Sequence, residues 1–343
     1  MGKAVKLADI AKQMNVSTVT VSKALSGQKG VSEEMREKIK KLADELGYRQ
    51  PSAARLAAKN KSYNIGVIIA EHYLGKYNTF YWQLYQEVTT KAAQKECFTM
   101  LEVLTLQMER ELEIPKILKE DKVDGLVIIG KVSSEYLREL ESETKIPLML
   151  LDFYSESEEC DAVVTDNFYG AYLLTNYLFR MGHKKIAYVG TLMYTGSITD
   201  RYFGYAKSLM EHGVEVRQDW VIADRDMETG LIGEGGTMQL PEEMPTAFVC
   251  NSDLTASELI KLLGEHGYCV PEDISVVGFD NYLYPGLCDV EITSYEVDMR
   301  EMARKTINTL IKKMANESYK KGLSVVEGHM VYKDSVQRFQ EDM

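Results

Sequence analysis

LADIAKQMNVSTVTVSKAL, at residues 7–25, decides the fold of the N-terminal part of this chain. Apolar residues recur at helical spacing over residues 7–14 and predict a helix with one apolar face. Asn15 follows, and asparagine tolerates the left-handed backbone that a tight turn requires. Ser17 is suited to cap a second helix, because its hydroxyl can accept hydrogen bonds from the first free amides. The stretch therefore predicts a helix-turn-helix.

The second predicted helix has an inward and an outward face. The residues expected to pack against the core are Val21, Ala24 and Leu25. The residues expected to point outward are Thr18, Val19, Ser22 and Lys23. In a helix-turn-helix this second helix enters the major groove of DNA. Simple core packing is the alternative role for Val19 and Ala24.

Charge is divided unevenly along the chain. Residues 1–61 carry 13 Lys and Arg against 6 Asp and Glu, whereas the remaining 282 residues carry 27 against 46. A basic head concentrates the attraction for phosphates in one module, and the acidic remainder is kept away from DNA. The charge and the helix-turn-helix pattern together predict a DNA-binding head.

The head is expected to end near residue 48. Ser32 is a suitable N-cap for a third helix, whose apolar residues recur up to Leu46 before Gly47. The next segment, 49–62, contains Pro51 and is rich in alanine, but it is too short to be a stable helix in isolation. We expect a hinge here that becomes helical only when a partner holds it.

From residue 63 onward, short apolar runs alternate with longer helical patterns. The predicted strands are 65–69, 98–103, 125–129, 146–151, 186–190, 246–250 and 274–279. The predicted helices are 82–97, 133–142, 167–182, 200–213, 253–267 and 298–316. This alternation is typical of α/β folds with parallel sheets. The length favours two such lobes with a ligand crevice at the carboxyl ends of the strands.

The sequence also excludes several classes of protein. No apolar run is long enough to span a membrane and the N-terminus does not resemble a signal peptide, so we expect a cytoplasmic protein. The five cysteines form no CxxC pair and the five histidines lack metal-ligand spacing, so no metal site and no cofactor are expected. The segment after Gly190 lacks the spacing and the lysine of a Walker motif, there is no GxSxG, and we expect no enzyme.

Four segments of the chain match the patterns of one family. They are the head at 6–48, TDNFYGAYLLTNYLFRMGHKKIAYVG at 165–190, DRYFGYAKSLMEHG at 200–213 and PTAFVCNSDLTASELIKLLGEHGYCVPEDISVVGFDN at 245–281. On these residues the chain resembles the LacI/GalR family of transcription regulators, named after the lactose repressor, over essentially its whole length. The resemblance implies a homodimer that binds a pseudo-palindromic operator.

The resemblance also implies a division into domains. A small all-α helix-turn-helix head spans 1–48, and a hinge helix and linker span 49–62. The effector core is similar to type I periplasmic binding proteins, with two α/β lobes that each combine two pieces of chain. The lobes are 63–163 with 291–322, and 164–290 with 323–343.

In the head, the resemblance assigns Thr18, Val19 and Lys23 to base-facing positions. Thr and Val can pack on thymine methyl groups, and Lys can donate to guanine. Ser17 and Ser22 are expected to contact phosphates or to act as caps, which fixes the register without reading the sequence.

In the hinge, the family usually places a leucine nine residues after the tyrosine that ends the third helix, and this leucine wedges into the minor groove. That position is Ala57 here, and Leu56 lies one residue earlier. Either the register of the hinge is shifted by one residue, or the wedge is weak. Arg55 is expected to reach the DNA backbone.

The resemblance places an effector site between the lobes. Its expected residues are Phe80, Tyr81, Asp152, Arg201, Met227, Ser252, Asp253 and Asp280. Aromatic rings can pack on the C–H faces of a sugar, while carboxylate and guanidinium groups can hold its hydroxyls. Ser252 departs from the Asn-Asp pair of many family members, which leaves the identity of the sugar open. Capping of the next helix is the alternative role for Asp253.

These observations predict a repressor whose operator affinity is controlled by a small effector, either a sugar or a sugar phosphate. A non-sugar effector such as a nucleobase is the next candidate. A solute-binding receptor and a sugar-processing enzyme are the alternatives from other classes. The basic head argues against a receptor, and only an analogy of fold supports an enzyme. The sequence does not distinguish induction from corepression.

Overall fold

In the computed structural model the chain divides into two units, Met1–Ser62 and Tyr63–Met343. The structure describes residues 7–25, 30–46, 48, 62–75, 79–156, 160–227, 229–233 and 238–340. Each unit has a hydrophobic core of its own.

The described residues of the first unit form three helices: α1 (Leu7–Met14), α2 (Thr18–Leu25) and α3 (Glu33–Glu45). Asn15, with a φ of 51°, turns the chain between α1 and α2. The core combines small and branched side chains from all three helices, which are Ile10, Ala11, Val21, Ala24, Ile39 and Ala43. The predicted helix-turn-helix and the third helix are therefore confirmed.

Hydrogen bonds at the helix ends hold α2 in place. The Ser17 hydroxyl accepts from the amide of Thr20 at 3.0 Å, and Ser32 caps α3 in the same way, so both predicted N-caps form. At the other end of α2, the guanidinium of Arg36 donates to the carbonyl of Ala24 at 3.2 Å. Because the last carbonyls of a helix have no partner within it, this bond satisfies one of them and complements the negative end of the helix dipole.

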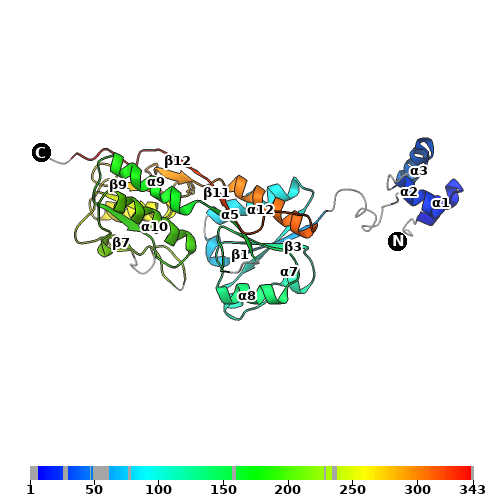
Figure 1. The fold of residues 1–343 in the computed structure, drawn as a ribbon, viewed down its shortest axis with the longest axis horizontal. Coiled ribbons are helices and arrows are strands. Elements are labelled where there is room, and N and C mark those ends of the chain that lie inside the picture. The colour runs from blue at the N-terminus through cyan, green and yellow to red at the C-terminus, as the bar shows by residue number, and fades with distance from the viewer. Residues whose placement is uncertain are drawn as a thin grey trace. The chain divides into compact units, whose positions relative to one another are not determined.

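The second unit alternates strands with helices (Figure 1). Its strands are β1 (Asn64–Ala70), β2 (Phe98–Leu104), β3 (Gly125–Ile129), β4 (Leu148–Leu151), β5 (Asp161–Thr165), β6 (Ile186–Val189), β7 (Val221–Ile222), β8 (Ala247–Cys250), β9 (Ser275–Val277), β10 (Ser294–Glu296), β11 (Leu323–Val326) and β12 (His329–Val331). Its helices are η1 (Glu71–Leu74), α5 (Phe80–Ala93), α6 (Leu106–Arg110), α7 (Lys116–Lys119), α8 (Ser134–Glu143), α9 (Asn167–Arg180), α10 (Gly196–Glu211), η2 (Gln218–Trp220), α11 (Asp253–Glu265) and α12 (Met299–Met314). The helices in the described part of the chain are too short or too polar to cross a membrane.

Parallel pairing builds two sheets in this unit. The first sheet has the strand order β11-β5-β4-β3-β1-β2, and the second sheet has the order β7-β6-β8-β9. β10 and β12 form a separate antiparallel pair. Side chains of the first sheet alternate between two cores, so that Val67 and Ile69 join one and Ile68 joins the other. Burial on both faces explains the continuous apolar runs in the sequence and confirms the predicted α/β fold.

Helices α9 and α10 approach each other closely in the region of the second sheet. At Gly204 on α10, an added Cβ would lie 2.1 Å from the carbonyl oxygen of Phe168 on α9, so only glycine fits there. This close approach brings Arg201 of α10 next to Asn167, the first residue of α9. The packing of two helices therefore sets up the polar site described below.

Strand pairing shifts the lobe boundaries that the sequence predicts. β5 continues in the first sheet to Thr165, two residues beyond the predicted limit. Residues 293–296 bridge to the second sheet, although the sequence places 291–322 with the first. β11 pairs with β5 in the first sheet, although the sequence places 323–343 with the second. The cause is the same each time: the backbone amides of these segments join a sheet ladder, which apolar patterning does not show.

Candidate functional site

The outward face of α2 is open to solvent. Its exposed or partly exposed residues are Ser17, Thr18, Val19, Ser22 and Lys23. Val19 is 60% exposed, which overturns the core-packing alternative for this residue, whereas Ala24 is buried. Methyl, hydroxyl and ammonium groups on one short helix can contact bases and phosphates. The predicted hinge residues Arg55, Leu56 and Ala57 lie outside the described residues.

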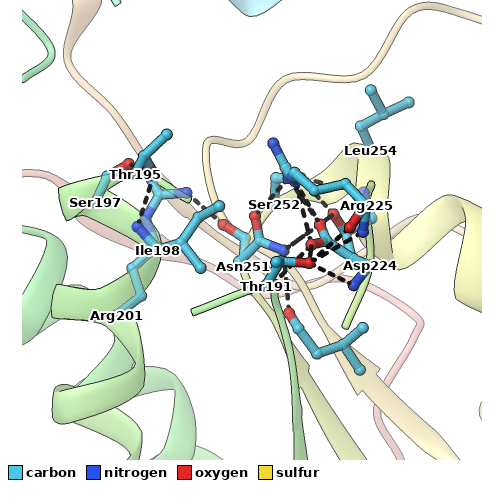
Figure 2. Close-up of polar contacts among 12 residues, drawn as sticks. Thr191, Thr195, Ser197, Ile198, Arg201, Asp224, Arg225, Asn251, Ser252 and Leu254 are labelled. Atoms are coloured by element: carbon cyan, nitrogen blue, oxygen red, sulfur yellow. Dashed lines mark hydrogen bonds and ion pairs between the residues drawn. The ribbon is translucent and has the colours of Figure 1, made fainter. Parts of the chain in front are cut away.

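Arg201 is the centre of a second, buried polar site. Its Nε donates to Oδ1 of Asn167 at 2.8 Å, and its Nη2 lies 3.2 Å from Oδ1 of Asp280. Its Nη1 donates to the carbonyl of Asn251 (Figure 2). The guanidinium carbon also lies 3.7 Å from the centre of the Phe279 ring, within the range of a cation–π contact. Four residues from three separate parts of the chain therefore fix this cation.

Asp280 follows β9 at the carboxyl end of the second sheet. Its φ of 97° is in the left-handed region, and its backbone amide donates to the carbonyl of Tyr295 at 2.9 Å. Only 12% of its side chain is exposed. Burial raises the pKa of the Asp280 carboxyl to about 6, although the nearby Arg201 opposes this rise. The ion pair therefore lies in surroundings where charge is costly.

Asp152 brings a second carboxyl group to the site from the end of β4, in the first sheet. It is 6% exposed and has a φ of 67°. Burial raises its pKa to about 7, while Arg201 and a hydrogen bond from Tyr81 lower it and Asp280 raises it. These interactions show that Asp152, Tyr81, Arg201 and Asp280 share one electrostatic environment, with contributions from both sheet regions.

Aromatic rings adjoin this carboxyl group at the start of α5. Tyr81 lies with its ring centre 4.3 Å from that of Tyr73 and 5.3 Å from that of Phe80. The hydroxyl of Thr79 accepts from the amide of Trp82 and so caps the helix that carries these rings. Phe80 and Tyr81 therefore belong to an aromatic cluster beside Asp152, with planar surfaces of the kind that pack on sugar rings.

A pair of charges that the sequence interpretation missed is connected to Arg201 through Asn251 (Figure 2). Asp224 is fully buried, and Arg225 forms an ion pair with it at 2.7 Å. Asp224 also accepts from Thr191 and Thr255, and the amide nitrogen of Asn251 donates to it at 2.7 Å. Burial opposes ionisation, but Arg225 and these donors lower the pKa of Asp224 to about 2. Asp224 is therefore a fixed anion that orients Asn251 and Arg225.

The missed residues differ in how visible they are in the sequence. Asn251 and Asn167 lie inside segments that match the family pattern, so their position next to strand ends was a usable signal. Asp224 and Arg225 follow β7, which is only two residues long and has no recognisable apolar run. No local pattern in the sequence marks them.

Ser252 and Asp253 hold the structure around the site. The Ser252 hydroxyl accepts from the amide of Thr255 and is the N-cap of α11, so capping by Asp253 is corrected: Asp253 is the first residue of the helix. The carboxylate of Asp253 instead accepts from the hydroxyl of Ser294 at 2.7 Å and from the amide of Tyr282 at 2.9 Å. Both of its oxygens are thus engaged in joining α11 to the segments after β9 and at β10.

Met227 lies apart from the buried groups. It is 59% exposed, in contrast to Arg201 and Asp152. Its side chain thus offers an apolar surface to solvent, and the structure does not bring it into the cluster of Tyr81, Asp152, Arg201 and Asp280 among the described residues.

Models of known protein families match two parts of the chain. Residues 6–51 match the model of bacterial regulatory proteins of the lacI family, and residues 175–336 match a periplasmic binding protein-like domain. The chain is 27% identical to the HTH-type transcriptional repressor PurR of Vibrio atlanticus over 331 residues, which cover 96% of this chain and 97% of the relative.

Solved structures show the same fold. The lac repressor dimer bound to operator and the anti-inducer ONPF is similar with a TM-score of 0.71 and 21% identity, and the match covers 98% of this chain and 100% of that one. A complex of the transcriptional regulator CelR with cellobiose gives a TM-score of 0.67 and 21% identity over 96% of this chain and 99% of that one. The chain thus combines a DNA-binding domain of the lacI family of bacterial regulatory proteins with a periplasmic binding protein-like domain, as LacI-type transcriptional repressors do.

Proposed function

We propose that this regulator is a cytoplasmic repressor that binds a pseudo-palindromic operator as a homodimer and responds to a sugar-type effector at the Arg201 cluster. The observation that carries the proposal is the buried ion pair of Arg201 and Asp280, which interacts electrostatically with the buried carboxyl group of Asp152 next to Tyr81. Carboxylate and guanidinium groups can each make two hydrogen bonds to neighbouring hydroxyls. A relative named as a transcriptional repressor supports the proposed repression, and the cellobiose complex of CelR supports a sugar-type effector.

The exposed face of α2 is the proposed reading surface for DNA. Thr18, Val19 and Lys23 would contact base edges in the major groove, while Ser22 would contact phosphate. Ser17 keeps its capping role, since its hydroxyl already accepts from the amide of Thr20. We assign Arg55, Leu56 and Ala57 to the minor-groove hinge on the family pattern alone.

The edge of the first sheet supports a homodimer. β2 lies at the end of the strand order and exposes three large apolar side chains, which are Phe98, Met100 and Val103. Exposed apolar edge strands are liable to pair or aggregate unless a partner covers them. A second copy of the chain would cover this edge and would supply the second head that a pseudo-palindromic operator requires.

Control of DNA binding follows from the place of the cluster between two sheet regions. Asp152 and Tyr81 belong to the region of the first sheet, whereas Arg201 and Asp280 belong to that of the second. A ligand that contacts both regions favours the arrangement in which both sets of contacts form. It can shift operator affinity only by the difference between its affinities for the two arrangements.

The test begins with an operator selected from random DNA by the purified full-length protein. Fluorescence anisotropy then measures operator affinity with and without each sugar of a panel. We expect at least one sugar to change this affinity in the wild type and in the Arg138→Ala control, whose arginine is exposed on α8. The same sugar should have no effect on Asp280→Asn. An unchanged response in Asp280→Asn, with its fold intact, would contradict the site.

A further inference from the structure

A lysine after β3 connects the region of the first sheet directly to that of the second. The Nζ of Lys131 donates to the carbonyl of Tyr194 at 2.7 Å and lies 3.4 Å from the carbonyl of Met193. Both carbonyls belong to the loop between β6 and α10. Lys131 is partly buried, and this burial lowers the pKa of its ammonium group, although Glu109 opposes the change. Hydrogen bonds from a charged donor are stronger than those between neutral groups.

A tyrosine after β4 makes a second connection between the same two regions. The hydroxyl of Tyr154 donates to the carboxylate of Asp200 on α10, with distances of 3.1 and 3.3 Å to its two oxygens. Burial raises the pKa of Asp200, while the hydrogen bond from Tyr154 lowers it. We call the contacts of Lys131 and Tyr154 with Met193, Tyr194 and Asp200 the clasp.

The segment 191–201 carries one side of the clasp and also part of the effector site proposed above. At its start, the amide and the hydroxyl of Thr191 donate to Oδ1 of Asp224, each at 2.9 Å (Figure 2). At its end is Arg201, the centre of the buried cluster. The clasp therefore acts on the same stretch of backbone that positions Arg201.

We propose that Lys131 and Tyr154 are positioning residues that hold the two sheet regions together in the effector-free protein and thereby help to determine its operator affinity. Every clasp contact joins two atoms of the protein, so its formation requires no ligand. The clasp lowers the free energy of the joined arrangement and raises its population. This inference rests on the proposed function, because it takes the arrangement of the two regions as the control of DNA binding.

Hydrogen–deuterium exchange and fluorescence anisotropy on the full-length protein, with no sugar added, test the proposal. The clasp variant combines Lys131→Met with Tyr154→Phe, which removes the ammonium and the hydroxyl but keeps most of the volume of each side chain. The matched control combines Lys145→Met with Tyr332→Phe, where both wild-type residues are exposed. Thermal unfolding checks that both variants fold, and operator binding is measured well below their Tm.

The amides of 191–200 should exchange faster in the clasp variant than in the wild type and the control. The operator Kd should change by about threefold or more in the clasp variant and remain that of the wild type in the control. Unchanged exchange would overturn the proposal, because the clasp would then not hold the two regions in solution. A lower Tm with unchanged operator affinity would also overturn it, since a purely structural role gives that result.

A sugar arm separates this inference from the proposed function. The probes are glucose, galactose, maltose and cellobiose, added to the wild type on the selected operator. A sugar that favours the joined arrangement should change operator affinity in the direction opposite to the clasp variant. A change in the same direction would overturn the clasp and leave effector control standing. If only the clasp variant changes operator affinity, the clasp is supported and these sugars are excluded as effectors. If neither does, both the inference and the proposed control by a sugar fail.

Discussion

The exposed face of α2 and the buried Arg201 cluster differ in how firmly neighbouring residues hold their side chains. On α2, Val19 is 60% exposed and is not part of the small hydrophobic core of the head. In the cluster, Arg201 is held by Asn167, Asn251, Asp280 and Phe279 before any ligand arrives. Residues on the first surface can change with little effect on the fold, whereas residues in the second site determine binding and stability together.

The largest effect is expected at Arg201. Arg201→Ala leaves the carboxylate of Asp280 buried without its cation, so we expect the free energy of unfolding to fall by about 3–5 kcal/mol. The effector response should disappear, while operator affinity at a temperature where the variant is folded changes less than threefold. Chemical denaturation and anisotropy measure the two quantities. If Arg201→Ala is as stable as the wild type, or still responds to the effector, Arg201 does not link the stability of the core to effector binding.

The pH dependence of stability gives the next effect. The pKa of Asp152 is about 7 in the folded protein and near the ordinary aspartate value of about 3.9 when unfolded. Between these values the folded state binds more protons than the unfolded state. Asp152 therefore makes the protein more stable as the pH falls from 8 toward 5, with a slope of up to about 1.4 kcal/mol per pH unit.

Asp152→Asn is expected to flatten this slope, and the control variant Asp289→Asn, whose aspartate is exposed, should preserve it. Urea denaturation at pH 8, 7, 6 and 5 measures the difference between the two variants. Asp280, with a pKa of about 6, acts in the same direction at lower pH, so part of the slope below pH 6 remains in Asp152→Asn. Identical slopes in Asp152→Asn and the wild type would contradict the raised pKa of Asp152.

Substitutions of two valines on α2 should distinguish DNA recognition from the stability of the head. Val21 is fully buried and Val19 is exposed. Val21→Ala should therefore reduce the stability of the head by on the order of 1–3 kcal/mol, because it leaves a cavity in a small core. Val19→Ala should change stability by less than about 0.5 kcal/mol but weaken operator binding several-fold. Circular dichroism melting and anisotropy distinguish the two, and the reverse pattern would place the reading face elsewhere.

The smallest effect distinguishes the two hinge registers. If Leu56 is the residue that wedges into the minor groove, Leu56→Ala should weaken operator affinity more than Ala57→Gly does. Both variants should respond to the effector like the wild type. A greater loss for Ala57→Gly, measured by anisotropy on the selected operator, would show that the register of the hinge is not shifted.

Patterns that are local in the sequence predicted most of the fold. The apolar spacing at 7–14 and the caps at Ser17 and Ser32 indicated the head, because each depends on neighbours within one turn. Continuous apolar runs likewise indicated the strands that are buried on both faces. The strands that were missed are β5, β7, β10, β11 and β12. β7, β10 and β12 have only two or three residues each, and β10, β11 and β12 pair with partners distant in the chain.

The candidate site was less predictable than the fold. Arg201, Asp152 and Asp280 were named from resemblance to a family, and their spacing in the sequence carries no sign that they meet. Asp224 and Arg225 were not identified from the sequence. Their role depends on hydrogen bonds with Thr191, Asn251 and Thr255, which lie far from them along the chain. Oδ1 of Asp152, which is buried and has no hydrogen-bond partner among the described residues, could be found only from the three-dimensional structure.

The most direct test is a thermal-shift screen of the full-length wild type, Asp280→Asn and Asp289→Asn against mono- and disaccharides, their phosphates and their amines. A ligand that binds only the folded state raises Tm. The account predicts a sugar-type ligand that raises Tm in the wild type and in Asp289→Asn but not in Asp280→Asn. A ligand that raises Tm equally in all three proteins would show that the effector binds away from the Arg201 cluster.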